Sequence, residues 1–336
     1  MAVEFVPLTD SFREWTRTRE QIRQEGAVGS LCRGIEIETH GVRTRIIAWP
    51  GNGLQTQSLH VLTLSPGESS ASYAFPSSEE LMLCLKGAGE INMRGQRIEM
   101  MAGDLAYFPE GVPHQIWNRR GSGADLILVT QISQPPVHLY GPGGYYDVDR
   151  CRWNFDRIEA DKRVARSVAI DPAFEMAPRD TYPKLRPQNL TTEEIRSGGA
   201  LFSFFSGAPF TGLGDGQMRL VLWPPYGART ANVHTACMPA GAASEIHTHP
   251  ISDEALLAPN CGQLYYVSGQ WVDCGQYDVA LAPCGVRHGI AIADRPGQPD
   301  SWPCGFASPP QVDLYMKTDY WTGEGYRRPA FVPYQA

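Results

Sequence analysis

Two stretches of this chain, residues 45–114 and 219–288, align with each other at a constant offset of 174 positions and without a gap. Identical aligned pairs include Trp49 with Trp223, His60 with His234, Glu80 with Glu254, and His114 with His288. A repeat of this length far exceeds the roughly 20 to 50 residues of solenoid units. The sequence therefore predicts two copies of one domain rather than an array of small repeats.

The length and the charge of the chain limit the classes of protein to consider. Its 336 residues are enough for two domains that each bury a core. A net charge of -7, with no run rich in Lys and Arg, argues against a nucleic-acid partner. No apolar run approaches the roughly 18 residues of a membrane span, and residues 1–10 do not resemble a secretion signal. We therefore expect a cytoplasmic protein that does not bind membranes.

The eight cysteines are scattered and include no C-x-x-C pair. In a chain of this size that pattern favours reduced thiols over a disulfide framework. Four of them lie between residues 261 and 304, which leaves a structural zinc or a redox role open as the alternative.

Both copies have the composition of all-β domains. Short runs rich in Val, Ile, Leu and Tyr alternate with Gly, Pro and Asn, as in sandwiches and barrels. The strands predicted in the first copy are 45–49, 58–64, 80–85, 90–93, 96–100, 104–108 and 124–132. A second β region is predicted from 201 to 317.

Helices are expected only outside these regions. One is predicted at residues 9–25, with Thr9 or Asp10 as N-cap, Ser11 and Glu14 as a capping box, and Gly26 as the end.

The domain boundaries follow from this pattern. We predict an N-terminal domain with a helical extension at 1–134 and a C-terminal domain with a coil tail at 201–336. Residues 135–200, rich in Pro, Gly, Arg and Asp, are predicted to be a linker with one short helix at 191–196.

The second copy contains a set of metal-binding side chains. Glu254 follows His247 and His249 closely, and His288 lies 34 positions after it. Residues two apart in a strand face the same side, so both histidines should point inward, together with Glu245. Three imidazoles and one carboxylate suit a divalent transition ion and leave one or two coordination positions open, as in catalytic sites.

These residues resemble the two motifs of the cupin superfamily. The first motif is matched in full by Gly241, His247, His249 and Glu254. The second is matched by Pro283, Gly285 and His288, although Gly275 stands two residues early and the final Asn is absent. The first copy has the second motif complete, in Gly103, Pro109, Gly111, His114 and Asn118. The resemblance implies two double-stranded β-helix, or jelly-roll, domains: a bicupin.

The first copy lacks most of the ligand set. Tyr73, Phe75, Glu80 and His114 stand at the four ligand positions, so two imidazoles are replaced by aromatic rings. We therefore predict one metal ion per chain, held by the second copy. Fe(II) is the first choice, with Mn, Ni, Co and Zn open. A small-molecule pocket beside Tyr73, Glu80 and His114 is the alternative to an ordinary core.

Five other residues are weaker candidates. Glu245 could serve as a general acid or base, or lie at the rim. His234 could contact substrate, although its repeat in His60 equally suggests a structural role. Arg229, Tyr266 and Arg287 could bind an anionic or aromatic substrate, or could be surface and packing residues.

The three-histidine, one-glutamate set resembles the centres of cupin dioxygenases. The leading hypothesis is therefore a metal-dependent dioxygenase that takes dioxygen and a small hydroxylated or carboxylated compound, aromatic or enolisable. The alternative is a non-redox hydrolase, isomerase or decarboxylase. Bicupin ureidoglycine aminohydrolases are similar in the Glu245-x-His247 segment. A storage or ligand-binding cupin ranks last of the three possibilities, because four ligands left without an ion would be costly to bury. The resemblance also implies a homodimer.

Overall fold

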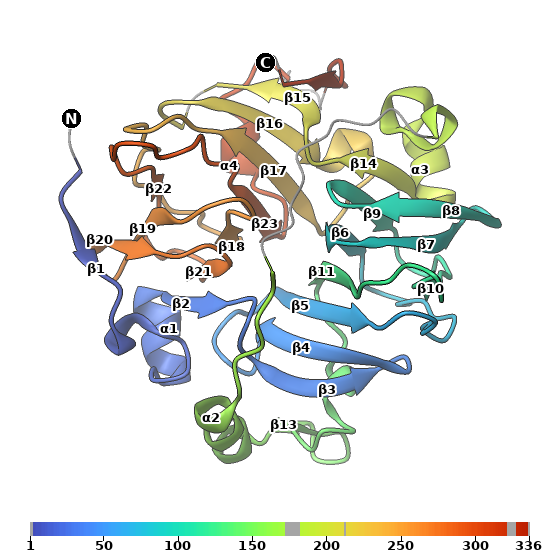
Figure 1. The fold of residues 1–336 in the computed structure, drawn as a ribbon, viewed down its shortest axis with the longest axis horizontal. Helices are drawn as coiled ribbons and strands as arrows, with labels where there is room; N and C mark the ends of the chain where they lie inside the picture. The colour runs from blue at the N-terminus through green and yellow to red at the C-terminus, as the bar shows by residue number, and fades with distance from the viewer. Residues whose placement is uncertain (1–2, 172–181, 212, 321–326, 335–336) are drawn as a thin grey trace.

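The computed structural model describes residues 3–171, 182–211, 213–320 and 327–334, and shows two β-sandwich domains side by side (Figure 1). The N-terminal domain consists of a seven-stranded and a three-stranded sheet. The first contains, in sheet order, β14 (Ala200–Ser203), β9 (Asp104–Phe108), β6 (Glu80–Lys86), β11 (Leu126–Ser133), β5 (Gln57–Leu64), β4 (Val42–Ala48) and β3 (Ile35–Thr39). The second contains β10 (Ile116–Trp117), β7 (Ala88–Met93) and β8 (Gln96–Met101).

The C-terminal domain repeats this plan with an eight-stranded and a four-stranded sheet. The first contains β2 (Ala27–Ser30), β21 (Asp278–Ala282), β18 (Asp253–Leu257), β23 (Cys304–Ser308), β17 (Asn232–Cys237), β16 (Gln217–Leu222), β15 (Ser206–Phe210) and β24 (Val332–Pro333). The second contains β1 (Phe5–Pro7), β20 (Gln270–Cys274), β19 (Gln263–Val267) and β22 (Ile290–Ala291). The predicted all-β jelly-roll class is confirmed, as are the seven strands predicted in the first copy, with small differences at their ends.

The prediction of one helix over residues 9–25 was wrong. The segment holds a 3-10 turn at Asp10–Phe12 and then the short helix α1 (Arg19–Glu25). The capping box that starts the helix is Thr18 with Gln21, not Ser11 with Glu14. The end at Gly26 is confirmed.

The predicted linker contains more regular structure than expected. The helix α3 (Thr192–Gly198) begins at a Thr191–Glu194 capping box, which confirms the short helix predicted there. The ten-residue helix α2 (Phe155–Val164) was not predicted. The remaining short elements are β12 (Tyr146–Asp147), β13 (Arg152–Trp153), α4 (Val312–Tyr315) and 3-10 turns at Val137–Tyr140, Pro183–Leu185, Pro187–Asn189 and Pro224–Tyr226.

The two domains exchange equivalent strands. β2, which follows α1, pairs with β21 of the C-terminal domain, and β14, which follows α3, pairs with β9 of the N-terminal domain. Gly26 and Gly199 precede these strands with φ near +75° to +78°, and a Cβ on either would collide with a carbonyl oxygen of the strand it joins. The duplication thus extends to helix, glycine and strand. The domain division at residues 134 and 200 stays a prediction.

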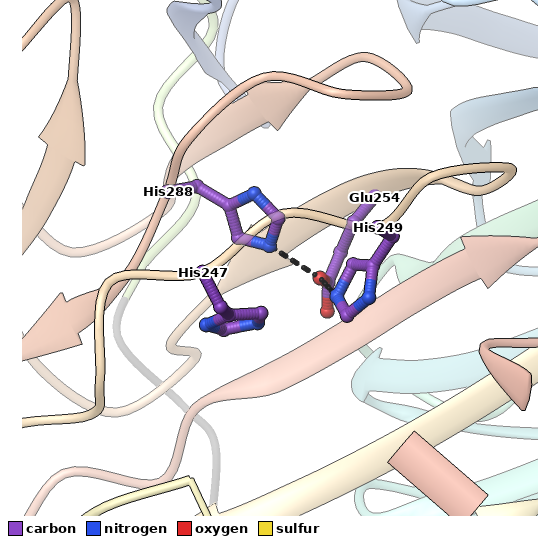
Figure 2. A group of neighbouring side chains, drawn as sticks. All are labelled: His247, His249, Glu254 and His288. Atoms are coloured by element: carbon purple, nitrogen blue, oxygen red, sulfur yellow. Dashed lines mark hydrogen bonds and ion pairs between the residues drawn. The ribbon is translucent and has the colours of Figure 1, made fainter. Parts of the chain in front are cut away.

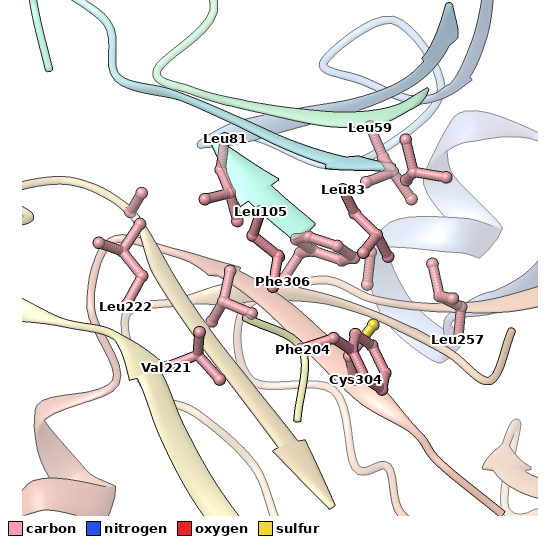
Figure 3. Packing of buried hydrophobic residues seen from close by; sticks show 14 of the residues in the cluster. Leu59, Leu81, Leu83, Leu105, Phe204, Val221, Leu222, Leu257, Cys304 and Phe306 are labelled. Atoms are coloured by element: carbon pink, nitrogen blue, oxygen red, sulfur yellow. The ribbon is translucent and has the colours of Figure 1, made fainter. Parts of the chain in front are cut away.

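One of the apolar clusters of the core spans both domains. Leu59, Leu81 and Leu83 of the N-terminal sheet belong to the same buried cluster as Leu257 and Phe306 of the C-terminal sheet (Figure 3). Because close-packed interiors leave side chains little room to move, this packing fixes the position of one sheet against the other.

Two further expectations concern the whole chain. All eight cysteines are free thiols, as predicted. Among the residues that the structure describes, no helix combines the length and the apolar character needed to cross a membrane.

Candidate metal centre

Four side chains of the C-terminal domain converge on one point. His247, His249, Glu254 and His288 each offer one ligand atom, and these atoms all lie within 4.8 Å of one another (Figure 2). It is the only group of this kind found among the described residues. Three of the four side chains are buried, and His247 is half-buried. The structure therefore brings together all four predicted ligands.

Backbone pairing places three of the ligands. His247 and His288 form an antiparallel bridge, each accepting the N–H of the other, at 2.9 and 3.0 Å. The Gly285 N–H donates to the carbonyl of His249 at 2.9 Å, and Gly285 has φ +80°, which favours glycine in the turn. His247 lies in an extended segment outside the regular strands. The prediction that His247 and His249 point inward is confirmed, whereas the prediction that Glu245 shares their face was wrong, because Glu245 is exposed. Glu254 lies on β18.

Each imidazole is oriented by a partner on its Nδ1. His247 Nδ1 lies 2.8 Å from the carbonyl oxygen of Glu245, and His288 Nδ1 lies 2.8 Å from that of Val286. A carbonyl only accepts, so these two Nδ1 atoms carry the proton. His249 Nδ1 lies 2.9 Å from a carboxylate oxygen of Asp313. All three rings therefore turn Nε2 toward the centre. In metal sites, hydrogen-bond partners on the other ring nitrogen orient ligating histidines in the same way.

The contacts between Glu254 and the histidines fit a bound cation. Glu254 Oε2 lies 3.0 Å from His249 Nε2 and 2.9 Å from His288 Nε2. Since each Nδ1 already faces an acceptor, both contacts are hydrogen bonds only if both rings are doubly protonated. Glu254 Oε1 accepts no hydrogen bond from any described residue, although His234 Nε2 is 3.3 Å away. A divalent ion would satisfy these lone pairs with neutral imidazoles.

The pKa values of three of these side chains agree with the binding of a cation. Burial and the neighbouring His288 lower the pKa of His247 to about 4, so the ring is neutral at pH 7. Burial also acts to lower the pKa of His249, but hydrogen bonds to Asp313 and Glu254 outweigh it and raise the pKa to about 9. Burial acts to raise the pKa of Glu254, but nearby histidines outweigh it and hold the pKa well below its ordinary value. A bound ion would replace the His249 proton.

Replacing Asp313 with alanine is expected to weaken metal affinity by roughly 10- to 100-fold, the usual loss when an outer partner of a ligating histidine is removed. Asp313 fixes the tautomer of His249, and its side chain is 29% exposed, so the fold should tolerate the change. Competition with a chelator measures the affinity. Asp319→Ala, which removes an exposed partner of Arg327, is the control and should bind metal normally. Unchanged affinity in Asp313→Ala would contradict the role of Asp313.

The equivalent place in the N-terminal domain has a different donor set. Tyr73 and Phe75 are buried there, and the Tyr73 hydroxyl donates to Glu80 Oε1 at 3.3 Å. His114 Nε2 lies 3.0 Å from Glu80 Oε2, and its ring stacks on Phe108 with centroids 4.0 Å apart. One imidazole and one carboxylate remain of the four ligands. That this domain binds no metal stays a prediction.

A narrow cavity adjoins the metal centre. His234, His247 and Glu254 line it, together with apolar side chains that include Met218 and Met238. Its volume is about 30 Å³, room for one or two water molecules. A more open hollow of about 640 Å³ lies along residues 144–156 and shares no lining residue with the centre.

The other predicted site residues lie in different places. Only His234 lines the cavity. Glu245 is exposed and contributes its backbone carbonyl to His247. Arg229 pairs with Glu110 at 3.6 Å and is largely exposed.

Tyr266 and Arg287 lie together, with the guanidinium 5.7 Å from the ring centroid, outside the residues that line the cavity.

Two residues of the site were missed by the sequence analysis. Asp313 lies 64 positions from His249, and nothing in the local sequence marks it. Gly305 lies in β23, between His234 on β17 and Leu256 on β18. A Cβ at this position would overlap Glu254 Oε1 and come within 2.6 Å of His234 Nε2. A glycine inside a strand is a known sign of such close approach, and could have drawn attention to Gly305.

Comparisons with known proteins agree with this architecture. Residues 60–130 match the Cupin domain family (Cupin_2), and no curated protein sequence matches the chain. Oxalate decarboxylase from Lactobacillus farciminis, in a formate complex, is similar over 84% of this chain and 86% of its own, with 16% identity and a TM-score of 0.52. A variant of salicylate 1,2-dioxygenase from Pseudoaminobacter salicylatoxidans, bound to gentisate, is similar over 83% and 78%, with 13% identity and a TM-score of 0.51. The 11S globulin from Wrightia tinctoria, with an auxin-binding site, is similar over 88% and 86%, with 9% identity and a TM-score of 0.52.

At these identities the likeness concerns the fold. That fold carries two enzymes with different reactions and a globulin, so the function has to be argued from the metal centre.

Proposed function

We propose that this chain, which has a cupin fold and whose residues 60–130 match the Cupin domain family, is a metal-dependent enzyme and specifically a dioxygenase. The observation that carries the proposal is the set of three oriented Nε2 atoms facing one buried carboxylate. When bound, a divalent transition ion supplies Lewis acidity, and Fe(II), our first choice, also supplies the one-electron chemistry that dioxygen requires. Four protein ligands would leave one or two positions for substrate and dioxygen.

The cavity walls indicate the class of substrate. None of the described residues that line the cavity is Lys or Arg, so an anionic group of the substrate has no basic partner there. Met218, Met238 and Leu256 offer apolar surface, and methionine side chains adapt readily to a ligand. We therefore propose a small phenolic or enolisable compound whose oxygen atoms bind at the ion. Because the cavity has room for only one or two water molecules, Met218 and Met238 would have to move aside to admit the apolar body of the compound.

His234 is the predicted substrate contact that we retain. It is buried, it lines the cavity, and its Nε2 is close to Glu254 Oε1. Burial lowers its pKa, so the ring is neutral and orients a ligand by hydrogen bonding rather than by charge. Exclusion of bulk water by the apolar walls would protect reactive species in the cavity.

Oxygen consumption tests the proposal. The Fe(II)-loaded protein should take up dioxygen with at least one member of a panel of phenolic acids, catechols and diketones, in proportion to the substrate consumed. His249→Ala should show no uptake with the same compound. No uptake across the panel, from protein shown to contain Fe(II), would contradict the dioxygenase assignment.

A non-redox metal enzyme is the second candidate, because three imidazoles and one carboxylate also suit ions without redox chemistry, such as Zn. Mn, Ni, Co or Zn could then act as a Lewis acid in decarboxylation, isomerisation or hydrolysis. Turnover that persists without dioxygen, and with Zn or Mn in place of Fe, would select this candidate.

The oligomeric state, the location and the partners of the protein are proposals as well. We propose a homodimer that acts in the cytoplasm on a small-molecule substrate, without nucleic-acid or membrane partners.

A further inference from the structure

A buried carboxylate stands immediately before the metal-ligating glutamate. Asp253, fully buried on β18, precedes Glu254. Its Oδ2 accepts the N–H of Gln55 and, at 2.7 and 2.9 Å, the N–H and the hydroxyl of Thr56. Gln55 and Thr56 belong to the N-terminal domain, in the loop between β4 and β5. The residue beside a ligand is thus tied to the other domain.

The second oxygen of Asp253 reaches the segment that carries another ligand. Asp253 Oδ1 accepts the N–H of Cys284 at 2.9 Å. Cys284 lies in the turn between β21 and His288, directly before Gly285, whose N–H bonds to the carbonyl of His249. One carboxylate therefore links the N-terminal loop, the strand of Glu254 and the turn that leads to His288.

Neighbouring contacts continue this link across the domain boundary. The side-chain amide of Gln57 donates to the carbonyls of Asp253 and Phe306, at 3.1 and 2.8 Å. The amide of Gln131 donates to the carbonyl of Ala307 at 2.8 Å. Both glutamines are buried residues of the N-terminal sheet. The C-terminal strands next to the metal centre are thus held by polar groups of the other domain.

The duplication provides a natural comparison. Glu79 occupies the position of Asp253 in the N-terminal domain and is also fully buried. It accepts the N–H groups of Arg229, Thr230 and Ala231 and the hydroxyl of Thr230, at 2.7 to 3.0 Å. The two carboxylates therefore cross the domain boundary in opposite directions to equivalent loops. They differ in their remaining partners, because Glu79 also accepts the hydroxyl of Tyr107, at 2.7 Å, whereas Asp253 accepts the N–H of Cys284. Only Asp253 adjoins a complete ligand set.

We propose that Asp253 is a positioning residue through which the N-terminal domain holds Glu254 and His288 in the geometry that binds metal. A buried carboxylate keeps its place because charge-assisted bonds to several N–H groups are strong and their loss is costly. The domain that lacks a full ligand set thereby contributes to the affinity of the other domain for its ion. The inference rests on the metal site of the proposed function and is independent of the reaction.

The alternative is a purely structural role, in which both carboxylates only join the domains. A purely structural role predicts that neutralising either carboxylate changes the metal affinity by the same amount. A positioning role of Asp253 predicts a larger loss of affinity for Asp253 than for Glu79, so variants of one chain can distinguish the two roles.

The test compares Asp253→Asn with Glu79→Gln in the full-length protein. An asparagine keeps one acceptor oxygen and turns an NH₂ group toward N–H donors, so it cannot serve both the N-terminal loop and Cys284. Zinc affinity is measured by competition with a chromophoric chelator, and stability by thermal unfolding. We expect Asp253→Asn to bind zinc roughly 10- to 100-fold more weakly and Glu79→Gln to stay within about threefold of the unaltered chain, with similar losses of stability.

Wild-type affinity in Asp253→Asn, or an equal loss in Glu79→Gln, overturns the proposal. Should Asp253→Asn fail to fold, the milder pair Thr56→Val and Thr230→Val decides. Each variant removes one hydroxyl that lies against the corresponding carboxylate, together with the contact of that hydroxyl to Ser308 or Ser133. Zinc binding weakened only in Thr56→Val supports the proposal, and equal binding in the two variants overturns it. Zinc affinity needs no substrate, so failure of the dioxygenase assay leaves this result unaffected.

Discussion

Replacing His249 with alanine is expected to remove the metal from the chain while the fold persists. The ring is buried between Asp313 and Glu254 and is one of only four ligands, so its loss should cost more than the roughly 10- to 100-fold of an outer partner. His249 belongs to none of the apolar clusters that form the core. Elemental analysis after reconstitution should change from one ion per chain to a small fraction of one, with a nearly unchanged circular dichroism spectrum.

His114→Ala is the matched control for this prediction. His114 makes the equivalent contact with Glu80 in the N-terminal domain, where two ligands are replaced by Tyr73 and Phe75. Its removal leaves Glu80 with fewer partners and should lower stability by about 1 to 3 kcal/mol. The metal content should stay near one ion per chain. A loss of metal in His114→Ala, or its retention in His249→Ala, would show that the ligand set has been wrongly assigned.

The second large effect is expected from Gly305→Ala. The added Cβ would overlap Glu254 Oε1 and crowd the imidazole of His234, and both side chains are buried. Glu254 cannot simply turn away, because His249 and His288 lie against its other oxygen. The carboxylate would have to leave the point that the three Nε2 atoms face.

We therefore expect the affinity of Gly305→Ala for zinc to fall by at least roughly tenfold. Stability should fall by about 1 to 3 kcal/mol from overpacking. Chelator competition and denaturant unfolding measure the two quantities. In Gly121→Ala, a Cβ would meet no atom within 4 Å, so both quantities should remain unchanged. Normal zinc affinity in Gly305→Ala would mean that the carboxylate has more freedom than its neighbours suggest.

The corresponding strands of the two domains differ in a way that matches their donor sets. In the strand register Thr130 stands between His60 and Met82, where Gly305 stands between His234 and Leu256. A side chain is accommodated in the first domain, whereas the second leaves the space to Glu254. The two copies therefore share a scaffold and differ at the few positions where an ion would need room and ligands.

The class of fold, the duplication and the four side chains of the metal centre could all be predicted from the order of the amino acids. These features are local or repeated: strands alternate with turn residues, three of the ligands lie close together in the sequence, and the fourth is marked by its counterpart in the first copy. The offset of 174 positions made the comparison possible within one chain, because each ligand of the second copy had a visible counterpart in the first. Helix boundaries were less certain, since Ser11 with Glu14 and Thr18 with Gln21 offered competing signals for a start.

The residues that surround and support the metal centre became visible only in the folded chain. Asp313 reaches His249 across 64 positions, and Asp253 reaches Thr56 across 197. The exchange of β2 and β14 likewise joins distant segments, because each of these strands precedes one repeat and pairs with a strand near the end of the other. Contacts of this kind depend on how two sheets pack face to face, which residue periodicity within one strand does not specify. A local pattern can tell which side chains bind an ion, whereas packing between distant segments determines what keeps them in place.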